Sequence, residues 1–196
     1  HFSIPKSIGA DVHFLKLREE NNWLPDLDEL KQLVIPGTKL IALTNPTNPT
    51  GSLIDKEMLA LIAEIAAEAG SWILCDEVYR GTDQQGTGMT ASITDIYEKG
   101  ISTAGMSKAY SLAGLRLGWV TASHKVIEDV MIHRDYDTIS VGMVDAYIAT
   151  VALESVDRLL KRAHEITRGN LNYLSSWLDG ETKLSWVKPR SGTTAL

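Results

Sequence analysis

Short apolar runs that alternate with amphipathic segments constrain the fold of this chain more than any other feature. Two such runs lie at 39–44 and 71–76, and a third, shorter strand is predicted at 101–104. Continuous apolar runs of this length are typical of strands buried on both faces of a parallel sheet. Between the first two runs, residues 55–69 have apolar side chains at helical spacing and are followed by Gly70 at the expected C-terminus. The succession of strand, helix and strand predicts an α/β fold with a mainly parallel sheet sandwiched by helices.

The rest of the chain contains elements of the same two kinds. Alternating apolar residues predict further strands, and apolar residues at helical spacing predict further helices. The additional strands are predicted at 11–17, 115–121 and 183–188, and the additional helices at 25–34, at 92–98 and over most of 123–179.

Composition narrows the classes of protein and of partner. The 196 residues are 44% hydrophobic and 22% charged, which is typical of a folded globular protein. The net charge of -6 gives no basic surface for a nucleic acid, and no apolar stretch reaches the ~18 residues that predict a membrane span. A single cysteine, Cys75, cannot form an internal disulfide, which favours a reducing, cytoplasmic location. The histidines and the cysteine have no metal-ligand spacing, so no metal site is predicted.

Candidate functional residues follow the predicted strands. In an open parallel sheet, the loops at the carboxyl ends of the strands form the ligand site. These loops begin at Asn45, Asp76 and Gly105 and carry polar side chains that the fold alone does not require. Taken singly, such residues are as common in turns and helix caps as in active sites. Their order along successive strand ends makes a shared site the better interpretation.

Three strings in these loops resemble a known family of enzymes. They are TNPTNPTG at 44–51, ILCDEVYRG at 73–81 and SKAYSLAGLRLGW at 107–119. Together they resemble the pyridoxal-phosphate enzymes of fold type I, and within them the class I and II aminotransferases. The resemblance covers essentially the whole chain and implies the large domain of that fold, with pyridoxal 5'-phosphate as cofactor. The chain departs from the family pattern at Gly105, where a serine or threonine is common, and at Ala113, where a proline is common.

The resemblance assigns the chemistry of the cofactor's reactive centre to two residues. Lys108 matches the lysine that forms the Schiff base and then moves a proton, since an amine can be tuned by its surroundings to act as a base. Asp76 matches the carboxylate that keeps the cofactor's ring nitrogen protonated through charge attraction. With Tyr79, these residues are the expected catalytic group.

The resemblance also implies how the remaining oxygens of the cofactor are bound. Asn48 and Tyr79 match the residues that donate hydrogen bonds to the phenolic oxygen. Arg116 matches the phosphate-binding arginine, whose planar guanidinium suits bidentate pairing with a phosphate. Ser107, next to the lysine, either contacts the phosphate or shapes the turn.

The same resemblance implies a domain organisation and a partner. We expect residues 1–155 to be a large cofactor-binding domain without its N-terminal part, and residues 156–196 to be a connecting helix and an incomplete small domain. The first residue, His1, and the final PRSGTTAL both suggest a piece of a longer protein. Members of the family are generally homodimers, so a homodimer is expected at full length.

Aminotransfer between an L-amino acid and a 2-oxo acid is the predicted activity, and three alternatives remain. A carbon-sulfur lyase on the same scaffold would use the same cofactor residues. The chain could instead be a cofactor-binding effector domain of a transcription regulator, or an α/β domain that has lost cofactor binding. Reaction products would separate the two enzymes, and a winged-helix segment upstream would favour the regulator.

Overall fold

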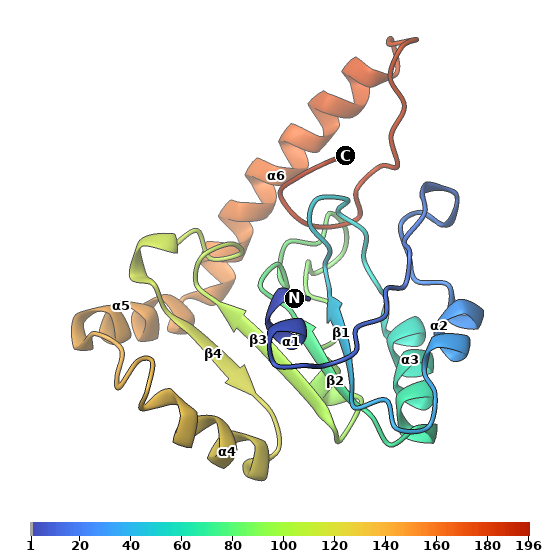
Figure 1. The fold of residues 1–196 in the computed structure, drawn as a ribbon. Helices are drawn as coiled ribbons and strands as arrows, with labels where there is room; N and C mark the ends of the chain where they lie inside the picture. The colour runs from blue at the N-terminus through green and yellow to red at the C-terminus, as the bar shows by residue number, and fades with distance from the viewer. Residues whose placement is uncertain (1) are drawn as a thin grey trace.

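The computed structural model describes residues 2–196, which form a four-stranded sheet with helices on both sides (Figure 1). The strands lie in the order β1-β2-β3-β4, which is also their order in the chain. The first three are parallel, and β4 runs antiparallel to β3. Their bounds are Leu40–Thr44 (β1), Trp72–Asp76 (β2), Gly100–Gly105 (β3) and Gly118–Thr121 (β4). This confirms the predicted α/β fold with a mainly parallel sheet.

Helices connect and flank these strands. The two most regular begin at aspartate caps: Asp26 accepts hydrogen bonds from two backbone N–H groups of α2, and Asp55 accepts one from the first turn of α3. The α-helices are Ser3–Ser7 (α1), Leu27–Leu33 (α2), Lys56–Glu68 (α3), His124–Arg134 (α4), Met143–Glu154 (α5) and Val156–Leu178 (α6). Short 3₁₀ helices lie at Glu19–Asn21 (η1), Ile93–Asp95 (η2) and Ala113–Leu115 (η3).

The main hydrophobic core lies between the sheet and α3. Leu59 and Ile62 of α3 are fully buried against Ile73 of β2, and Ile93 of η2 closes the same cluster. Burial of a side chain of this size is worth about 2 kcal/mol, so this layer holds α3 and the first three strands together. The free thiol of Cys75 lies in this core, and burial raises its pKa.

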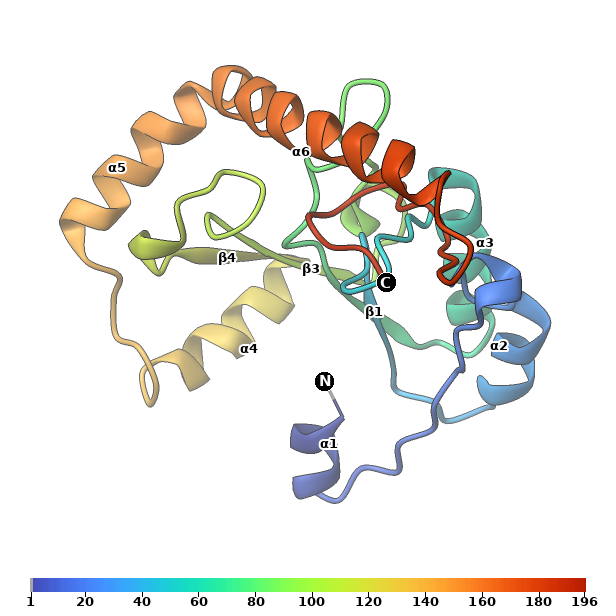
Figure 2. The ribbon, with the colours of Figure 1, turned by 90° about the horizontal axis from the view of Figure 1, so that it is seen from above.

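The other side of the sheet is less completely covered. Seen from above, α6 passes over one side of the sheet, and α4 and α1 lie on the other (Figure 2). Leu40 of β1 is 43% exposed and Val120 of β4 is 38% exposed. The expectation that the strands are buried on both faces is therefore only partly met, because α1 and α4 leave these side chains accessible.

A second, smaller core supports the segment between β3 and β4. Met106, Ala149 and Ala152 are buried together, with Trp119 packed against them. Two of these residues belong to α5, so α5 covers the loop that follows β3. Among residues 2–196, no helix is both long and apolar enough to span a membrane.

Two predicted strands are wrong. Residues 11–17 and 183–188 have irregular structure, and neither pairs with a strand in the described part of the chain. Their alternating pattern reflects single anchoring contacts: Leu15 packs against the main core, and Trp186 and Val187 are half-buried. Alternation alone does not provide a neighbouring strand, and a strand needs one to satisfy its backbone.

Three other boundaries also differ from the prediction. The last strand begins at Gly118 rather than at residue 115, because Arg116 adopts a left-handed backbone conformation (φ 48°) at the end of η3. Only Ile93–Asp95 of the predicted helix 92–98 is helical, as a 3₁₀ turn. The predicted helix over 123–179 is divided into α4, α5 and α6.

Candidate active site

The parallel register brings the predicted site loops to one edge of the sheet. Thr44 lies beside Asp76, and Asp76 lies beside Thr103, at the carboxyl ends of β1, β2 and β3. Each of these strands leads directly into a loop that carries a predicted site residue. The sheet therefore fixes where the three loops begin.

The loop after β1 is anchored by its first asparagine. Asn45 is 1% exposed, and its side-chain amide donates to the carbonyl of Ile54 and accepts from the N–H of Ile54, both at 2.9 Å. Its backbone N–H also donates to the carbonyl of Asp76. These bonds close the loop at its base and leave Asn48 exposed at its tip.

Asn48 and Tyr79 come together from two loops. The Asn48 Nδ2 donates a hydrogen bond of 2.9 Å to the Tyr79 hydroxyl, and the Tyr79 side chain is buried. An amide N–H and a phenolic O–H at this separation can both donate to one oxygen placed beside them. The structure thus brings together the two residues assigned to a single oxygen of the cofactor.

Asp76 ends β2 and is half-buried. Its Oδ1 accepts a hydrogen bond of 3.1 Å from the N–H of Val78, which fixes the carboxylate at the start of the loop that carries Tyr79. Alternation along β2 places Asp76 on the face of the sheet opposite Cys75 and its core. The carboxylate therefore lies on the less covered face.

Lys108 lies in the loop between β3 and β4. Its Nζ is 5.6 Å from the centre of the Tyr79 ring, and the side chain is exposed. The backbone around it is fixed by two hydrogen bonds, from Ser111 to Lys108 and from Leu112 to Met106. The predicted amine thus reaches the tyrosine that contacts Asn48.

Arg116 ends the same loop. Its backbone is left-handed, and its Nη1 donates a hydrogen bond of 3.0 Å to the carbonyl of Ala113. The side chain is exposed, and this is its one hydrogen bond to residues 2–196. The side chain therefore keeps donors for an anion, as the phosphate assignment requires.

Two small residues, Gly105 and Ser107, precede Lys108 in this loop. Ser107 is half-buried, and its side chain makes no hydrogen bond with any residue of 2–196. Gly105 pairs with Gly118, and a Cβ on Gly105 would lie 3.0 Å from the carbonyl oxygen of Leu117. A serine or threonine, which is common at this position, would therefore require the Leu117 backbone to move by a few tenths of an ångström.

A group of residues around Tyr79 has no sequence signal. Thr82 and Ser191 are buried and lie 3.1 Å apart through their hydroxyls, although they are 109 residues apart in the chain. The Thr194 hydroxyl donates to the Oδ1 of Asn48 at 3.4 Å. No short motif relates such distant positions, so sequence reasoning could not identify these contacts.

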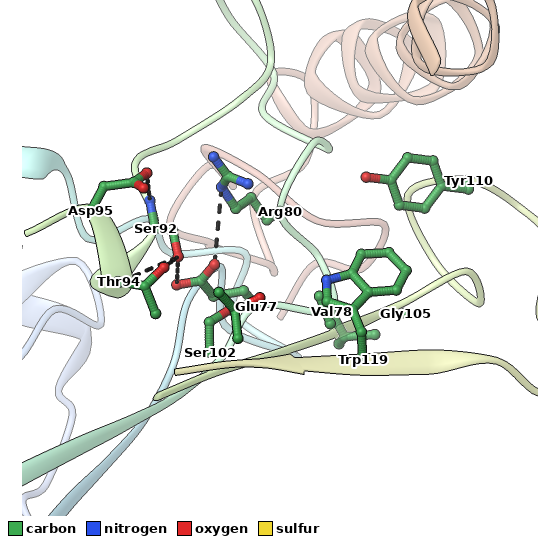
Figure 3. A pocket seen from close by; sticks show the side chains of 12 residues that line it. Glu77, Val78, Arg80, Ser92, Thr94, Asp95, Ser102, Gly105, Tyr110 and Trp119 are labelled. Carbon is green, nitrogen blue, oxygen red and sulfur yellow. Dashed lines mark hydrogen bonds and ion pairs between the residues drawn. The ribbon is translucent and has the colours of Figure 1, made fainter. Parts of the chain in front are cut away.

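A cavity of about 230 Å³ is lined by residues of β3 and β4 and of the loop after β2 (Figure 3). Glu77, Arg80 and Ser92 are on one side of it, and Tyr110 and Trp119 are on the other (Figure 3). Glu77 is buried and accepts hydrogen bonds from the Ser92 hydroxyl and the N–H of Ile93, which gives it a structural role. None of the predicted cofactor residues lines this cavity.

In the described part of the chain, no group of three or more His, Cys, Asp or Glu residues could hold a metal ion.

Comparison with known proteins identifies the family. The sequence model of the family "Aminotransferase class I and II" matches residues 3–193. The chain belongs to this family. Capreomycidine synthase of Streptomyces vinaceus is 28% identical over 95% of the chain and 48% of its own length. Aspartate aminotransferase of Pyrococcus horikoshii is 33% identical over 72% of the chain and 36% of its own length.

Solved structures of aminotransferases have the same fold. A PLP-dependent aminotransferase from Streptococcus suis superposes with a TM-score of 0.92 and 42% identity, over 96% of this chain and 50% of its own. An aspartate aminotransferase of Thermus thermophilus gives 0.86 and 25% identity, over 95% of this chain and 49% of its own. The chain spans about half the length, or less, of these relatives.

Proposed function

We propose that this aminotransferase chain forms the cofactor-binding core of an enzyme that uses pyridoxal 5'-phosphate to move an amino group between an L-amino acid and a 2-oxo acid. One observation carries the proposal. The Asn48 amide and the Tyr79 hydroxyl are 2.9 Å apart, and the Lys108 amine lies over the same tyrosine ring. Two neutral donors and one amine, from three different loops, match what an aldehyde with a neighbouring phenolic oxygen requires.

The other residues of the site fit the rest of the cofactor. Asp76 supplies a carboxylate at the end of β2, three residues before Tyr79, suited to a protonated ring nitrogen. Arg116 supplies free guanidinium donors, suited to a phosphate. Ser107 lies two residues after the end of β3 and next to Lys108, and its hydroxyl, which has no hydrogen-bond partner among residues 2–196, can also donate to the phosphate. The residue types and their placement therefore fit the group that the family implies.

Each residue then has a defined task. When bound, pyridoxal phosphate supplies an electron sink for the bond broken at the α-carbon of the amino acid. Lys108 binds the cofactor through Nζ and afterwards carries a proton on the same nitrogen. Asp76 holds a proton on the ring nitrogen through its negative charge. Asn48 and Tyr79 stabilise negative charge on the phenolic oxygen by donating to it.

Substrates, assembly and location belong to the same proposal. Relatives at 33–36% identity are named aspartate aminotransferase and glutamate-pyruvate aminotransferase, which supports an amino acid and a 2-oxo acid as the substrates. The homodimer is proposed from the family resemblance. The cytoplasmic location is proposed from the single cysteine, Cys75.

Chemical trapping of Lys108 tests the cofactor assignment. The protein is incubated with pyridoxal phosphate, reduced with borohydride and mapped by peptide mass spectrometry. A single pyridoxyl group on Lys108 is expected. The label should disappear in Lys108→Ala and persist in Lys99→Ala, because Lys99 precedes β3 at the opposite end of the sheet, where its amine donates to the carbonyl of Gly70. Scattered labelling without enrichment at Lys108 contradicts the proposal.

Product analysis tests the type of reaction. The protein in its full natural sequence context is supplied with an L-amino acid and a 2-oxo acid. Transfer predicts a new amino acid and a new oxo acid in equal amounts, with no free ammonia. Release of ammonia as the main product would show that the reaction is an elimination and not a transfer. The cofactor assignment would still hold.

A further inference from the structure

A buried set of hydroxyls lies behind Tyr79. The Thr82 hydroxyl donates to the carbonyl of Tyr79 at 2.6 Å and accepts from the N–H of Gly192 at 2.9 Å. The Ser191 hydroxyl lies 3.1 Å from that of Thr82 and donates to the Oδ1 of Asp83 at 2.9 Å. Thr82 is 1% exposed and Ser191 is 0% exposed. A buried hydroxyl that donates to one group and accepts from another holds both of them in one position, since water cannot replace a lost partner.

The segment 189–194 also holds the loop that carries Asn48. The N–H groups of Arg190 and Ser191 both donate to the carbonyl of Gly51, at 2.9 and 3.0 Å. Gly51 has a positive φ of 65°, and a Cβ there would lie 2.4 Å from the Cβ of Pro189. The segment therefore packs directly against the backbone of this loop.

Segment 189–194 thus forms hydrogen bonds with two loops, the one that carries Asn48 and the one that carries Tyr79. It contacts the Tyr79 loop through Ser191 and Gly192, and the Asn48 loop through Arg190 and Ser191. Thr194 adds a contact to the Asn48 side chain itself, because its hydroxyl donates to Oδ1. This bond orients the amide so that Nδ2 faces Tyr79. Nothing in the chemistry of the cofactor requires such a link.

We propose that Ser191 is a positioning residue, which together with Thr82 sets how well Tyr79 and Asn48 stabilise the anionic phenolic oxygen of bound pyridoxal phosphate. The inference rests on the proposed function. Ser191 contacts no part of the cofactor and acts through the backbone of residues 79–82 and 48–51. Its removal leaves the buried carboxyl of Asp83 without the Ser191 donor and the Thr82 hydroxyl without its neighbour, and the two donors lose their fixed separation.

The expected effect is on a property of the bound cofactor. A weaker pair of donors stabilises the phenolic anion less, so the pKa that governs the cofactor's visible absorbance rises. We expect a rise of about half a unit, or threefold in the proton equilibrium, for Ser191→Ala and for Thr82→Val. Thr82→Ser keeps the hydroxyl and should retain the original absorbance pKa.

The experiment is a pH titration of the cofactor's absorbance in the protein in its full natural sequence context, saturated with pyridoxal phosphate. Ser71→Ala is the matched control. Ser71 is also 0% exposed, and its hydroxyl donates one hydrogen bond, to the carbonyl of Thr38, but it lies just before β2, at the end of the strand opposite Asp76. A purely structural role for Ser191 predicts the same result for Ser191→Ala as for Ser71→Ala.

The outcomes separate this inference from the proposed function. If borohydride labels Lys108 in the wild-type protein and only the Ser191 and Thr82 variants shift the absorbance pKa, the inference stands. If Lys108 is labelled but these variants titrate like Ser71→Ala, Ser191 has no positioning role. If the wild-type protein is not labelled at Lys108, the proposed function itself fails. Should Ser191→Ala not fold, the pair Thr82→Val and Thr82→Ser decides, since the first keeps the shape of threonine without its hydroxyl and the second keeps the hydroxyl without the methyl group.

Discussion

Asn48 donates a hydrogen bond of 2.9 Å to the hydroxyl of Tyr79, across 31 residues of sequence. The two side chains come from loops after different strands, β1 and β2, whose parallel pairing brings the loop origins side by side. Since each residue also has a free donor or acceptor function, the pair can bind a third oxygen as a unit.

The first prediction concerns this pair. We expect Asn48→Ala and Tyr79→Phe each to weaken the binding of pyridoxal phosphate about tenfold, because each removes a hydrogen bond to a charged oxygen. The double variant should lose much less than the product of the two effects, since the residues contact each other. Dissociation constants from fluorescence titration of the four proteins test this. Fully multiplicative losses would show that the two side chains act independently.

Sequence reasoning could predict that the candidate site residues lie close together because they follow strand ends. Asn48, Asp76 and Lys108 each follow a strand whose apolar run is readable from the sequence, and a parallel sheet brings such ends together. The three elements that carry them, β1, β2 and β3, agree closely with the prediction. At these residues, the local sequence pattern is therefore sufficient to predict where they lie in the fold.

The contacts that sequence reasoning missed depend on distant segments. Ser191 lies beside Thr82 only because the chain after α6 returns to the sheet, and no periodicity records that return. The strand predicted at 183–188 is wrong for a related reason, since alternation does not create a pairing partner. The left-handed backbone of Arg116, which delays β4 by three residues, is likewise set by the turn around it.

A second prediction concerns the guanidinium of Arg116. Arg116→Lys keeps the charge and the same backbone requirement at φ 48° but removes the planar fork. We expect the dissociation constant for pyridoxal phosphate to rise about tenfold, with little change for pyridoxal, which lacks the phosphate. Arg18→Lys is the control, because Arg18 pairs with Glu29 on an exposed surface. Equal losses for both forms of the cofactor would remove Arg116 from the phosphate site.

A third prediction separates the two asparagines of the loop after β1. Asn45→Asp replaces the amide donor to the carbonyl of Ile54 by a buried carboxylate, which should lower the free energy of unfolding by about 3 kcal/mol. Asn48→Asp makes the same chemical change at an exposed position and should leave stability within about 0.5 kcal/mol. Urea unfolding at pH 7 measures both. Similar stabilities for the two variants would contradict the structural role of Asn45.

The last prediction concerns the proton on Asp83. Burial raises the pKa of this carboxyl above its ordinary value of 3.8, while the Ser191 hydroxyl and the charges of His164, Arg190 and Arg168 oppose the rise. The ionised carboxylate therefore costs stability at neutral pH. As the pH falls through the folded-state pKa, the folded protein takes up the proton first and gains stability relative to the unfolded chain.

Replacing Asp83 by Asn imitates the protonated carboxyl, because the amide can donate to Ser191 and carries no charge. Asp83→Asn should be more stable than the wild-type protein at pH 7, and the difference should shrink as the pH falls toward 4. Free energies of unfolding from urea titrations across this range measure it. Repeating the pair in a His164→Gln background removes the charge interaction between the histidine and Asp83. A difference in stability that stays constant between pH 7 and 4 would show that Asp83 does not take up a proton in this range, and would contradict the prediction.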